Sequence, residues 1–249
     1  MIRYREIAAA ALLATASGGA QADPASLAPL TFVYQVEHPS YGNVGTYTNT
    51  VVQNGDSVDV QTQLHVTIKV LGIPLFHQDA NRLEQWEKGR LIAFHSGTDD
   101  NGKEIDVDGK AQGDEFIIHS PFGNFAAPAR VHPSNPWAIQ SLNTDTMMGT
   151  KTGKVVQVAV TDTGEANVTF DGQAMRLHQY FVDGEKHQVV WLDGDGVVAA
   201  FQTEENGTRI TFVLKHDNRA AAAQQVPAPV ALMQATNPSS SGSFHPSRD

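Results

Sequence analysis

Cysteine is absent from the 249 residues of this chain, and several motifs that signal a particular chemistry are absent with it. Without cysteine there can be no disulfide, no thiol nucleophile and no thiolate metal ligand. The sequence also lacks a Gly-x-Ser-x-Gly motif and a glycine-rich loop that opens a helix. A serine hydrolase triad and a nucleotide-phosphate loop therefore have no support, and stability must come from packing of the core.

Basic residues are scarce, since 17 Lys and Arg face 27 Asp and Glu and give a formal net charge of -10. A surface of this sign repels nucleic acid and anionic lipid, so we expect no nucleic-acid partner. Long apolar runs are also missing. A membrane-spanning helix needs about twenty consecutive apolar residues, and no stretch reaches that length, so we expect no stable membrane anchor.

The first 22 residues have the features of a secretory signal peptide. Arg3 and Arg5 supply a positive start, residues 7–16 are apolar, and Ala20-Gln21-Ala22 is a small-x-small cleavage site. We therefore expect export to the periplasm with cleavage after Ala22. No cysteine follows that site, which excludes a lipid-anchored lipoprotein of the bacterial kind.

Alternation of apolar and polar residues is clearest over residues 57–70, where only Thr62 interrupts the apolar face. This is the period of a β-strand that is buried on one face. We interpret Gly72 and Pro74 as a bend at which the same ribbon turns a corner and continues to Trp86. The apolar positions are Val58, Val60, Leu64, Val66, Ile68 and Val70.

Turn dipeptides of the Asn-Gly and Asp-Gly type separate most of the other apolar runs, and consecutive hairpins indicate a meander. We predict an all-β fold in which a curved antiparallel meander forms an open half-barrel over residues 23–216. Residues 135–148 lack the alternation and are predicted to form a lid over the sheet, with a short helix near 138–142. Residues 217–249, rich in Ala, Pro and Ser, are predicted to be a disordered tail.

An open half-barrel leaves bulky side chains on its concave face without a second sheet to cover them, which favours an apolar ligand groove. An alternative interpretation is that the same rings pack as core against the lid. If the groove exists, His65, His95 and His178 supply polar anchors and aromatic rings supply contact area. The predicted ligand-binding residues are His65, Phe76, Trp86, Phe94, Trp137, His178, Tyr180 and Trp191.

An enzyme in the same cavity is the rival hypothesis, for instance a lyase, isomerase or hydrolase that uses His95 with Asp99 or Asp100 as an acid-base pair. The competing interpretation is that both aspartates only flank the Asn101-Gly102 hairpin turn. A third class is a structural envelope protein whose sheet edges recruit a partner. The ten histidines show no metal-ligand spacing, so we expect no metal and no other cofactor.

Several short motifs, together with the run over residues 70–103, resemble those of a family of secreted Gram-negative proteins of unknown function. The resemblance covers roughly residues 30–214. That family is similar in shape to periplasmic half-barrel carriers of the LolA type, which shelter acyl chains on a concave face behind a helical lid. The resemblance implies a fold and no established active site. The motifs are Pro133-Ser134-x-x-Trp137, Leu142-Asn143-Thr144-x-Thr146, Thr152-Gly153 and Val190-Trp191-Leu192-Asp193-x-x-Gly196.

We therefore predict a periplasmic protein that holds a hydrophobic or amphipathic small molecule in a concave β-sheet groove, as a carrier or an envelope accessory factor. The sequence does not specify the oligomeric state.

Overall fold

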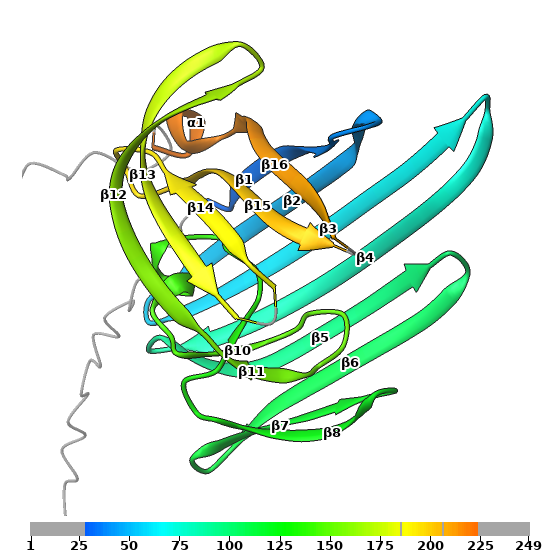
Figure 1. Cartoon of the computed structure of the whole chain (residues 1–249). Helices are drawn as coiled ribbons and strands as arrows, with labels where there is room; N and C mark the ends of the chain where they lie inside the picture. Colours follow the sequence, from blue (N-terminus) through cyan, green and yellow to red (C-terminus); the bar gives the residue numbers. More distant parts are fainter. Residues whose placement is uncertain (1–27, 185, 206, 224–249) are drawn as a thin grey trace, which may run out of the picture.

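A computed structural model describes residues 28–184, 186–205 and 207–223, and Figure 1 shows them as one strongly curved sheet with very little helix. The sheet has 13 antiparallel strands in the order β12-β13-β14-β15-β16-β1-β2-β3-β4-β5-β6-β7-β8. Because β12 and β8 are its two edges, the sheet is not closed into a barrel. The predicted all-β, open antiparallel meander is confirmed. The predicted signal peptide, residues 1–22, lies outside the described residues.

Each strand of the large sheet pairs with a neighbour along the chain, except that β16 returns beside β1. Two-residue and other short turns make most of these connections, as their turn chemistry predicts. The strands are β1 (Leu30–His38), β2 (Gly42–Asn54), β3 (Ser57–Val70), β4 (Ile73–Glu87), β5 (Arg90–Asp100), β6 (Lys103–Gln112), β7 (Glu115–Ser120), β8 (Gly123–Pro128), β12 (Ala159–Phe170), β13 (Gln173–Asp183), β14 (Gln188–Leu192), β15 (Val198–Glu205) and β16 (Thr208–Asp217).

Residues 129–158 leave the large sheet and cross its concave side (Figure 1). They contain a three-stranded sheet, with β10 (Thr146–Met148) between β9 (His132–Pro133) and β11 (Val155–Gln157). A 3-10 helix, η1 (Ile139–Leu142), confirms the predicted short helix. Met147 and Met148 of β10 are buried in two different hydrophobic clusters, so this segment forms part of the core as well as covering it.

The predicted bend at Gly72 is wrong, because the chain reverses direction there. Leu71 and Gly72 both have positive φ, 51° and 81°, and form the turn of a tight hairpin between β3 and β4. Two consecutive positive φ values suit the right-handed twist of a hairpin. Pro74 is accommodated beside a register shift between Ile68 and Lys69. The single bent ribbon of the sequence prediction is therefore two full-length strands.

Most of the core lies on the concave face, in two clusters. The first packs β1–β3 against β13–β16 and contains Tyr34, Tyr47 and Phe201. The second packs β3–β8 against the crossing segment and contains Trp86 and Phe116. A smaller third cluster contains Trp191, whose chain neighbours Val190 and Leu192 belong to the first cluster. Since neighbouring residues of a strand face opposite sides, Trp191 lies on the other face of the sheet.

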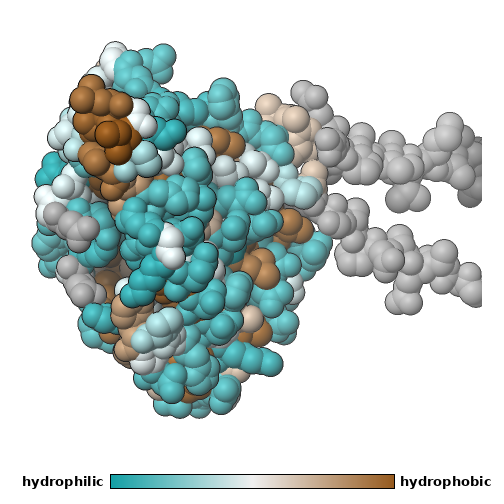
Figure 2. Space-filling model, turned by 90° about the vertical axis from the view of Figure 1, so that its right-hand side faces the viewer, coloured by the Kyte–Doolittle hydropathy of each residue, from teal (hydrophilic) through white to brown (hydrophobic). Residues whose placement is uncertain are grey.

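The β3–β4 hairpin ends in the most exposed aliphatic residues of the described chain, and a brown patch is visible near the top of the molecule in Figure 2. Leu71 is 98% exposed, Ile73 64% and Leu75 59%. No helix in the described ranges has the length and apolar character that crossing a bilayer requires.

The fold continues slightly beyond the predicted domain boundary at residue 216. A short helix, α1 (Arg219–Ala223), follows β16, and Arg219 donates to Asp193 Oδ2 at 2.9 Å and to Asp217 Oδ2 at 3.0 Å. These contacts join the end of the described chain to the loop after β14. The rest of the predicted tail, 224–249, lies outside the described residues.

Candidate functional site

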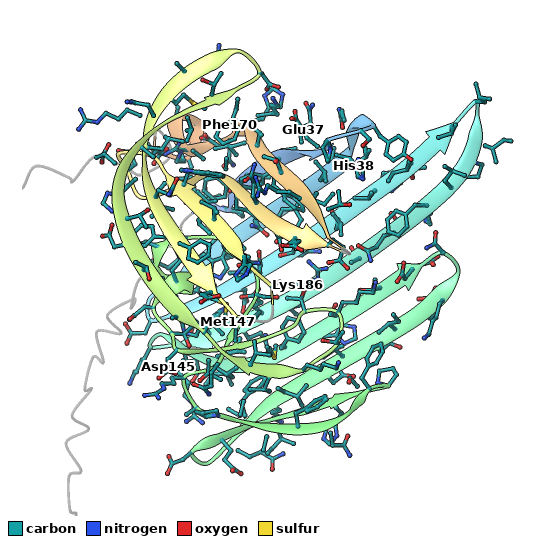
Figure 3. The ribbon with its side chains drawn as sticks, in the orientation of Figure 1. Glu37, His38, Asp145, Met147, Phe170 and Lys186 are labelled. Carbon is teal, nitrogen blue, oxygen red and sulfur yellow. The ribbon has the colours of Figure 1, made fainter. Side chains whose placement is uncertain are left out.

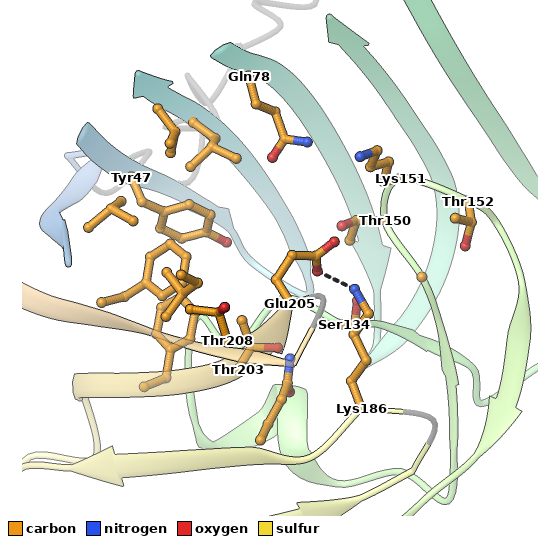
Figure 4. Close-up of a pocket in the computed structure, with 18 of the residues that line it drawn as sticks. Tyr47, Gln78, Ser134, Thr150, Lys151, Thr152, Lys186, Thr203, Glu205 and Thr208 are labelled. Carbon is orange, nitrogen blue, oxygen red and sulfur yellow. Dashed lines mark hydrogen bonds and ion pairs between the residues drawn. The ribbon is translucent and has the colours of Figure 1, made fainter. Parts of the chain in front are cut away.

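A cavity of about 500 Å³ lies between the concave face of β1–β4, the strands β13–β16 and the crossing segment. Figure 4 shows Tyr47 on one side of it and Lys151 and Thr152 on the other. Its volume falls within the range of about 300–1,000 Å³ that small-molecule sites occupy. Apolar atoms supply the larger part of the lining surface, and the apolar lining residues are Val36, Val44, Leu64, Val66, Ile68, Phe76, Met147, Met148, Val156, Val158, Val182, Phe201, Ile210 and Phe212.

Charged side chains lie where the lining reaches solvent. Lys151 pairs with Asp100, and Lys186 pairs with Glu205, as the dashed line in Figure 4 marks. In Figure 3, Met147 and Lys186 both lie toward the middle of the molecule, whereas Phe170 lies near the turn between β12 and β13. Two lysines of the lining are therefore paired with carboxylates, whereas the exposed Lys154 makes no ion pair within the described residues.

The floor of the cavity is polar along one row that crosses the sheet. Asn49, Thr62, Arg82 and Ser96 are register partners on β2, β3, β4 and β5, and all four are buried. Only Arg82 of this row also lines the cavity. The row is unusual because charged residues are rarely buried unless they are paired.

Asn135 connects this row to a hydrogen-bond network beneath the crossing segment. The Tyr47 hydroxyl donates to Asn135 Oδ1, and Asn135 Nδ2 donates to Thr62 Oγ1 at 3.0 Å and to Glu84 Oε1 at 2.7 Å. Glu84 Oε2 accepts a bond from Trp86 Nε1 at 3.1 Å. The network holds the crossing segment on the sheet through groups that would be costly to bury unpaired.

Burial shifts the titration of all three ionisable groups in this region. It raises the pKa of Glu84 to about 7, although hydrogen bonds from Asn135 and Trp86 oppose the shift. It raises the pKa of Tyr47 to about 12. Burial also lowers the pKa of Arg82, and the neighbouring Tyr47 and Glu84 side chains oppose that change. In each case burial disfavours the charged form.

Sequence reasoning missed Arg82 and Glu84, although the sequence carries a signal for them. Ala80, Arg82, Glu84 and Trp86 alternate with exposed residues along β4, so two charged residues stand in an otherwise apolar register. A charge on the buried face of a strand predicts a functional or structural polar site. Asn135 gives no such local signal, because it lies in an irregular segment.

Of the eight predicted ligand-binding residues, Phe76 lines the cavity. Tyr180 lines a separate, shallower pocket beside η1, with Val160 and Leu142. Trp86 and Phe94 are buried in the second core cluster, and the remaining two tryptophans also pack in clusters. Trp137 packs against Trp86 with ring centroids 6.1 Å apart, and Trp191 packs in the third cluster.

The predicted histidine anchors His65 and His178 make hydrogen bonds to carboxylates away from the cavity. His65 Nδ1 lies 2.5 Å from Asp79 Oδ1, and the His65 side chain is 59% exposed. His178 Nε2 lies 2.6 Å from Asp162 Oδ1. Neither histidine is among the residues that line the cavity.

The three residues of the enzyme hypothesis are not brought together. His95 pairs with Asp108 at 2.8 Å on the outer face. Asp99 Oδ1 accepts a bond from the Gly102 backbone N–H at 2.6 Å, which is the expected contact of a hairpin turn. Asp100 pairs with Lys151 instead. The structure therefore contains the hairpin turn that was the alternative interpretation of these aspartates.

One group on the outer face of the β3–β4 hairpin has the residue types of a metal site. The ligand atoms of His65, His77 and Asp79 lie within 4.8 Å of one another. Asp79 bridges the two histidines, with Oδ2 at 3.1 Å from His77 Nε2. The histidines are twelve positions apart, and it is the hairpin turn that places them together.

Comparisons with known proteins identify a family and a structure of similar fold, and they assign no activity. A model of the family described as "Domain of unknown function (DUF6134)" matches residues 34–215. Among solved structures, the chain is similar to a β-barrel-like protein of domain of unknown function DUF1849 from Brucella abortus, with a TM-score of 0.57 and 9% identity over 77% of this chain and 97% of that chain. At that identity the likeness concerns the fold alone. No curated protein matches the chain.

Proposed function

Because the chain belongs to the DUF6134 family, whose description assigns no activity, we propose a function from its geometry: the protein holds an amphipathic small molecule in the concave cavity. The observation that carries this proposal is the cavity of about 500 Å³ with a mostly apolar lining. A dry core would have filled this space, since protein interiors pack with few voids larger than a water molecule.

The distribution of polar groups favours an amphipathic ligand over a purely apolar one. Arg82 and Tyr47 lie among the buried lining residues, while Lys151 and Lys186 lie where the lining is more exposed. A ligand with one polar end would meet partners in the cavity that a hydrocarbon would leave unsatisfied.

The periplasm is the proposed location, and carrier or envelope accessory factor is the proposed role. Support comes from the signal-peptide features of residues 1–22 and from the likeness expected with half-barrel carriers of the LolA type. In this protein, as in carriers of the LolA type, a concave sheet would shelter an apolar chain behind a covering segment. Here residues 129–158 would be that segment.

Mass spectrometry of small molecules that co-purify with the full chain from periplasmic extract tests the proposal directly. We expect an amphiphile in stoichiometric amount, released by organic solvent. A thermal-shift panel of fatty acids and terpenoids gives an independent measurement, because a ligand that binds only the folded state raises the melting temperature. Empty protein together with no shift across the panel would refute the proposal.

A pair of tryptophan substitutions distinguishes ligand binding in the cavity from binding elsewhere on the protein. Ile68→Trp adds bulk to a half-buried lining residue of β3, whereas Leu83→Trp adds it to a 39% exposed residue of β4 that does not line the cavity. We expect Ile68→Trp to abolish the thermal shift and Leu83→Trp to retain it. Equal shifts in both variants would place the ligand elsewhere.

A further inference from the structure

Arg82 is a buried cation that makes no ion pair at contact distance with any carboxylate of the described residues, although the nearby Glu84 favours its charged form. Its side chain is about nine-tenths buried, since the residue is 9% exposed, and its Nε atom has no hydrogen-bond partner within the described ranges. Glu84 is the nearest carboxylate along β4, but its two oxygens accept bonds from Asn135 and Trp86. A buried guanidinium without a direct ion pair is costly, and a ligand anion in the cavity would supply the missing partner.

Other buried polar atoms near Arg82 also lack hydrogen-bond partners. Ser96 is its register partner on β5, and Thr98 lies one row away; the hydroxyls of both are buried without a partner in the part of the chain that the structure describes. Asn49 Nδ2, in the same cross-strand row, is also buried and unpaired. Unsatisfied buried polar atoms are few in native proteins, so this row of the sheet is unusually short of hydrogen-bond partners. Arg82 is the member of the row that lines the cavity, where a ligand could supply one.

We propose that Arg82 is the head-group site of the cavity and that the ligand is an anionic amphiphile with a carboxylate head. This inference rests on the proposed function and specifies the ligand class. The planar guanidinium presents two parallel N–H donors, which match the two oxygens of a carboxylate. Arg82 lines the cavity, so part of its side chain faces the space that such a group would occupy.

The register of the β3–β4 hairpin sets the direction of the tail. Leu64, Val66 and Ile68 follow one another on the concave face of β3, at increasing distance from the Thr62–Arg82 pair and toward the hairpin tip. Phe76 lies opposite Ile68 on β4. The head therefore lies at Arg82 and the tail lies along this apolar track, which spans about 13 Å at 3.3 Å per residue.

The number of charges favours a carboxylate over a phosphate. Lys151 and Lys186 are already paired with Asp100 and Glu205. Lys154 makes no ion pair within the described residues but is exposed to solvent, so Arg82 is the buried cation of the lining that lacks an ion-pair partner. One guanidinium balances one negative charge. A phosphate monoester carries close to two charges at neutral pH and would leave part of that charge buried and unpaired.

The test compares the binding of three ligands with the same chain length: hexadecanoate, hexadecanol and hexadecyl phosphate. Each affinity is measured by displacement of a fluorescent fatty-acid analogue from the full mature chain. We expect wild-type protein to bind hexadecanoate at least tenfold more tightly than hexadecanol, and more tightly than the phosphate. Arg82→Gln is expected to bind both hexadecanoate and hexadecanol with the affinity of wild type for hexadecanol. Arg176→Gln removes an arginine that is 74% exposed on β13 and serves as the matched control.

The outcomes separate this inference from the proposed function. Equal affinity of wild type for acid and alcohol, or an unchanged preference in Arg82→Gln, would overturn the role of Arg82 while leaving an amphiphile-binding cavity. Tighter binding of the phosphate would overturn the carboxylate assignment. Binding of none of the three by wild type would refute both proposals.

The melting temperature of the ligand-free protein provides a second readout, which distinguishes a role of Arg82 in binding from a role in folding. If Arg82 is retained for binding and not for folding, Arg82→Met should melt at a higher temperature than wild type, because it replaces an uncompensated charge with an apolar chain of similar length. A lower melting temperature for Arg82→Met would show that the guanidinium supports the fold, and would contradict the inference.

Discussion

Asn135 Nδ2 donates a hydrogen bond to Glu84 Oε1 at 2.7 Å, although 51 positions separate the two residues in the sequence. The contact joins the segment that crosses the concave face to the middle of β4. Both groups are buried, Asn135 at 2% and Glu84 at 0% exposure. The crossing segment is therefore held on the concave face of the sheet by polar contacts as well as by apolar packing.

Replacing Asn135 should destabilise the protein strongly. Asn135→Ala removes the partner of the Tyr47 hydroxyl, of Thr62 and of Glu84 at once. We expect a loss of about 2–4 kcal/mol in the free energy of unfolding, because buried polar groups would be left unpaired. Urea denaturation of wild type and variant measures this loss in the free energy of unfolding. The matched control, Asn143→Ala, changes an exposed asparagine after η1 and should cost less than about 0.5 kcal/mol.

The raised pKa of Glu84 makes stability depend on pH in a defined direction. The folded state holds this proton up to about pH 7, whereas the unfolded state releases it near the ordinary value of 4.5. The folded state therefore binds more protons between these values, and stability falls as the pH rises through this window. The total loss is up to about 3 kcal/mol and should level off above pH 8.

Denaturation curves of wild type and Glu84→Gln between pH 4.5 and 8.5 measure this effect. Glutamine cannot ionise, so the curve of the variant should lack the decline that Glu84 causes. The comparison concerns the slope with pH and not the absolute stability, because Gln also changes the hydrogen bonds to Asn135 and Trp86. Parallel slopes for the two proteins would mean that Glu84 titrates normally.

Gly45 is required by the close approach of two strands. A Cβ atom at this position of β2 would lie 1.9 Å from the backbone carbonyl oxygen of His65 on β3. We expect Gly45→Ala to lower the free energy of unfolding by more than about 3 kcal/mol, since backbone atoms must move. At Gly97 of β5 the nearest atom is a side-chain oxygen of Asp106 at 3.4 Å. Gly97→Ala should be neutral within about 1 kcal/mol, and similar losses for both variants would contradict this account.

Arg219 should stabilise the end of the described chain in a salt-dependent manner. It lies near Asp193, Asp195 and Asp217, and its side chain is 29% exposed. We expect Arg219→Gln to cost about 1 kcal/mol at low ionic strength and less in 1 M NaCl, where screening is stronger. Because its hydrogen bonds lower the pKa of Asp217, the contribution should also be lost as the pH falls and Asp217 becomes protonated. A difference that is constant with salt and pH would contradict an electrostatic origin.

The all-β class, the antiparallel meander and most hairpin positions could be predicted from the sequence, because strand period and turn chemistry are local. Thr62 illustrates this: the alternation of β3 places it on the buried face, and it is fully buried. Gly72 shows the limit, because glycine and proline suit both a bend and a turn, and only the pairing of Ile73 with Val70 distinguishes them.

The candidate site depended on contacts that the sequence does not encode locally. Aromatic residues such as Trp86 and Trp191 are of the type that lines ligand grooves. In the structure, however, Trp86 packs beneath the crossing segment and Trp191 packs on the opposite face of the sheet. Arg82 could be recognised as a charge in an apolar register, but its lack of a counter-ion depends on where Asn135 directs Glu84.

The amino-acid sequence by itself determined which residues share a face of each strand and where most hairpins turn, because both follow from the properties of neighbouring residues. The tertiary structure decided how far the sheet curls, where residues 129–158 cross it and which side chains line the remaining space. Those features depend on packing between residues far apart in the chain, where many arrangements satisfy the same local pattern and only one satisfies all the buried contacts together.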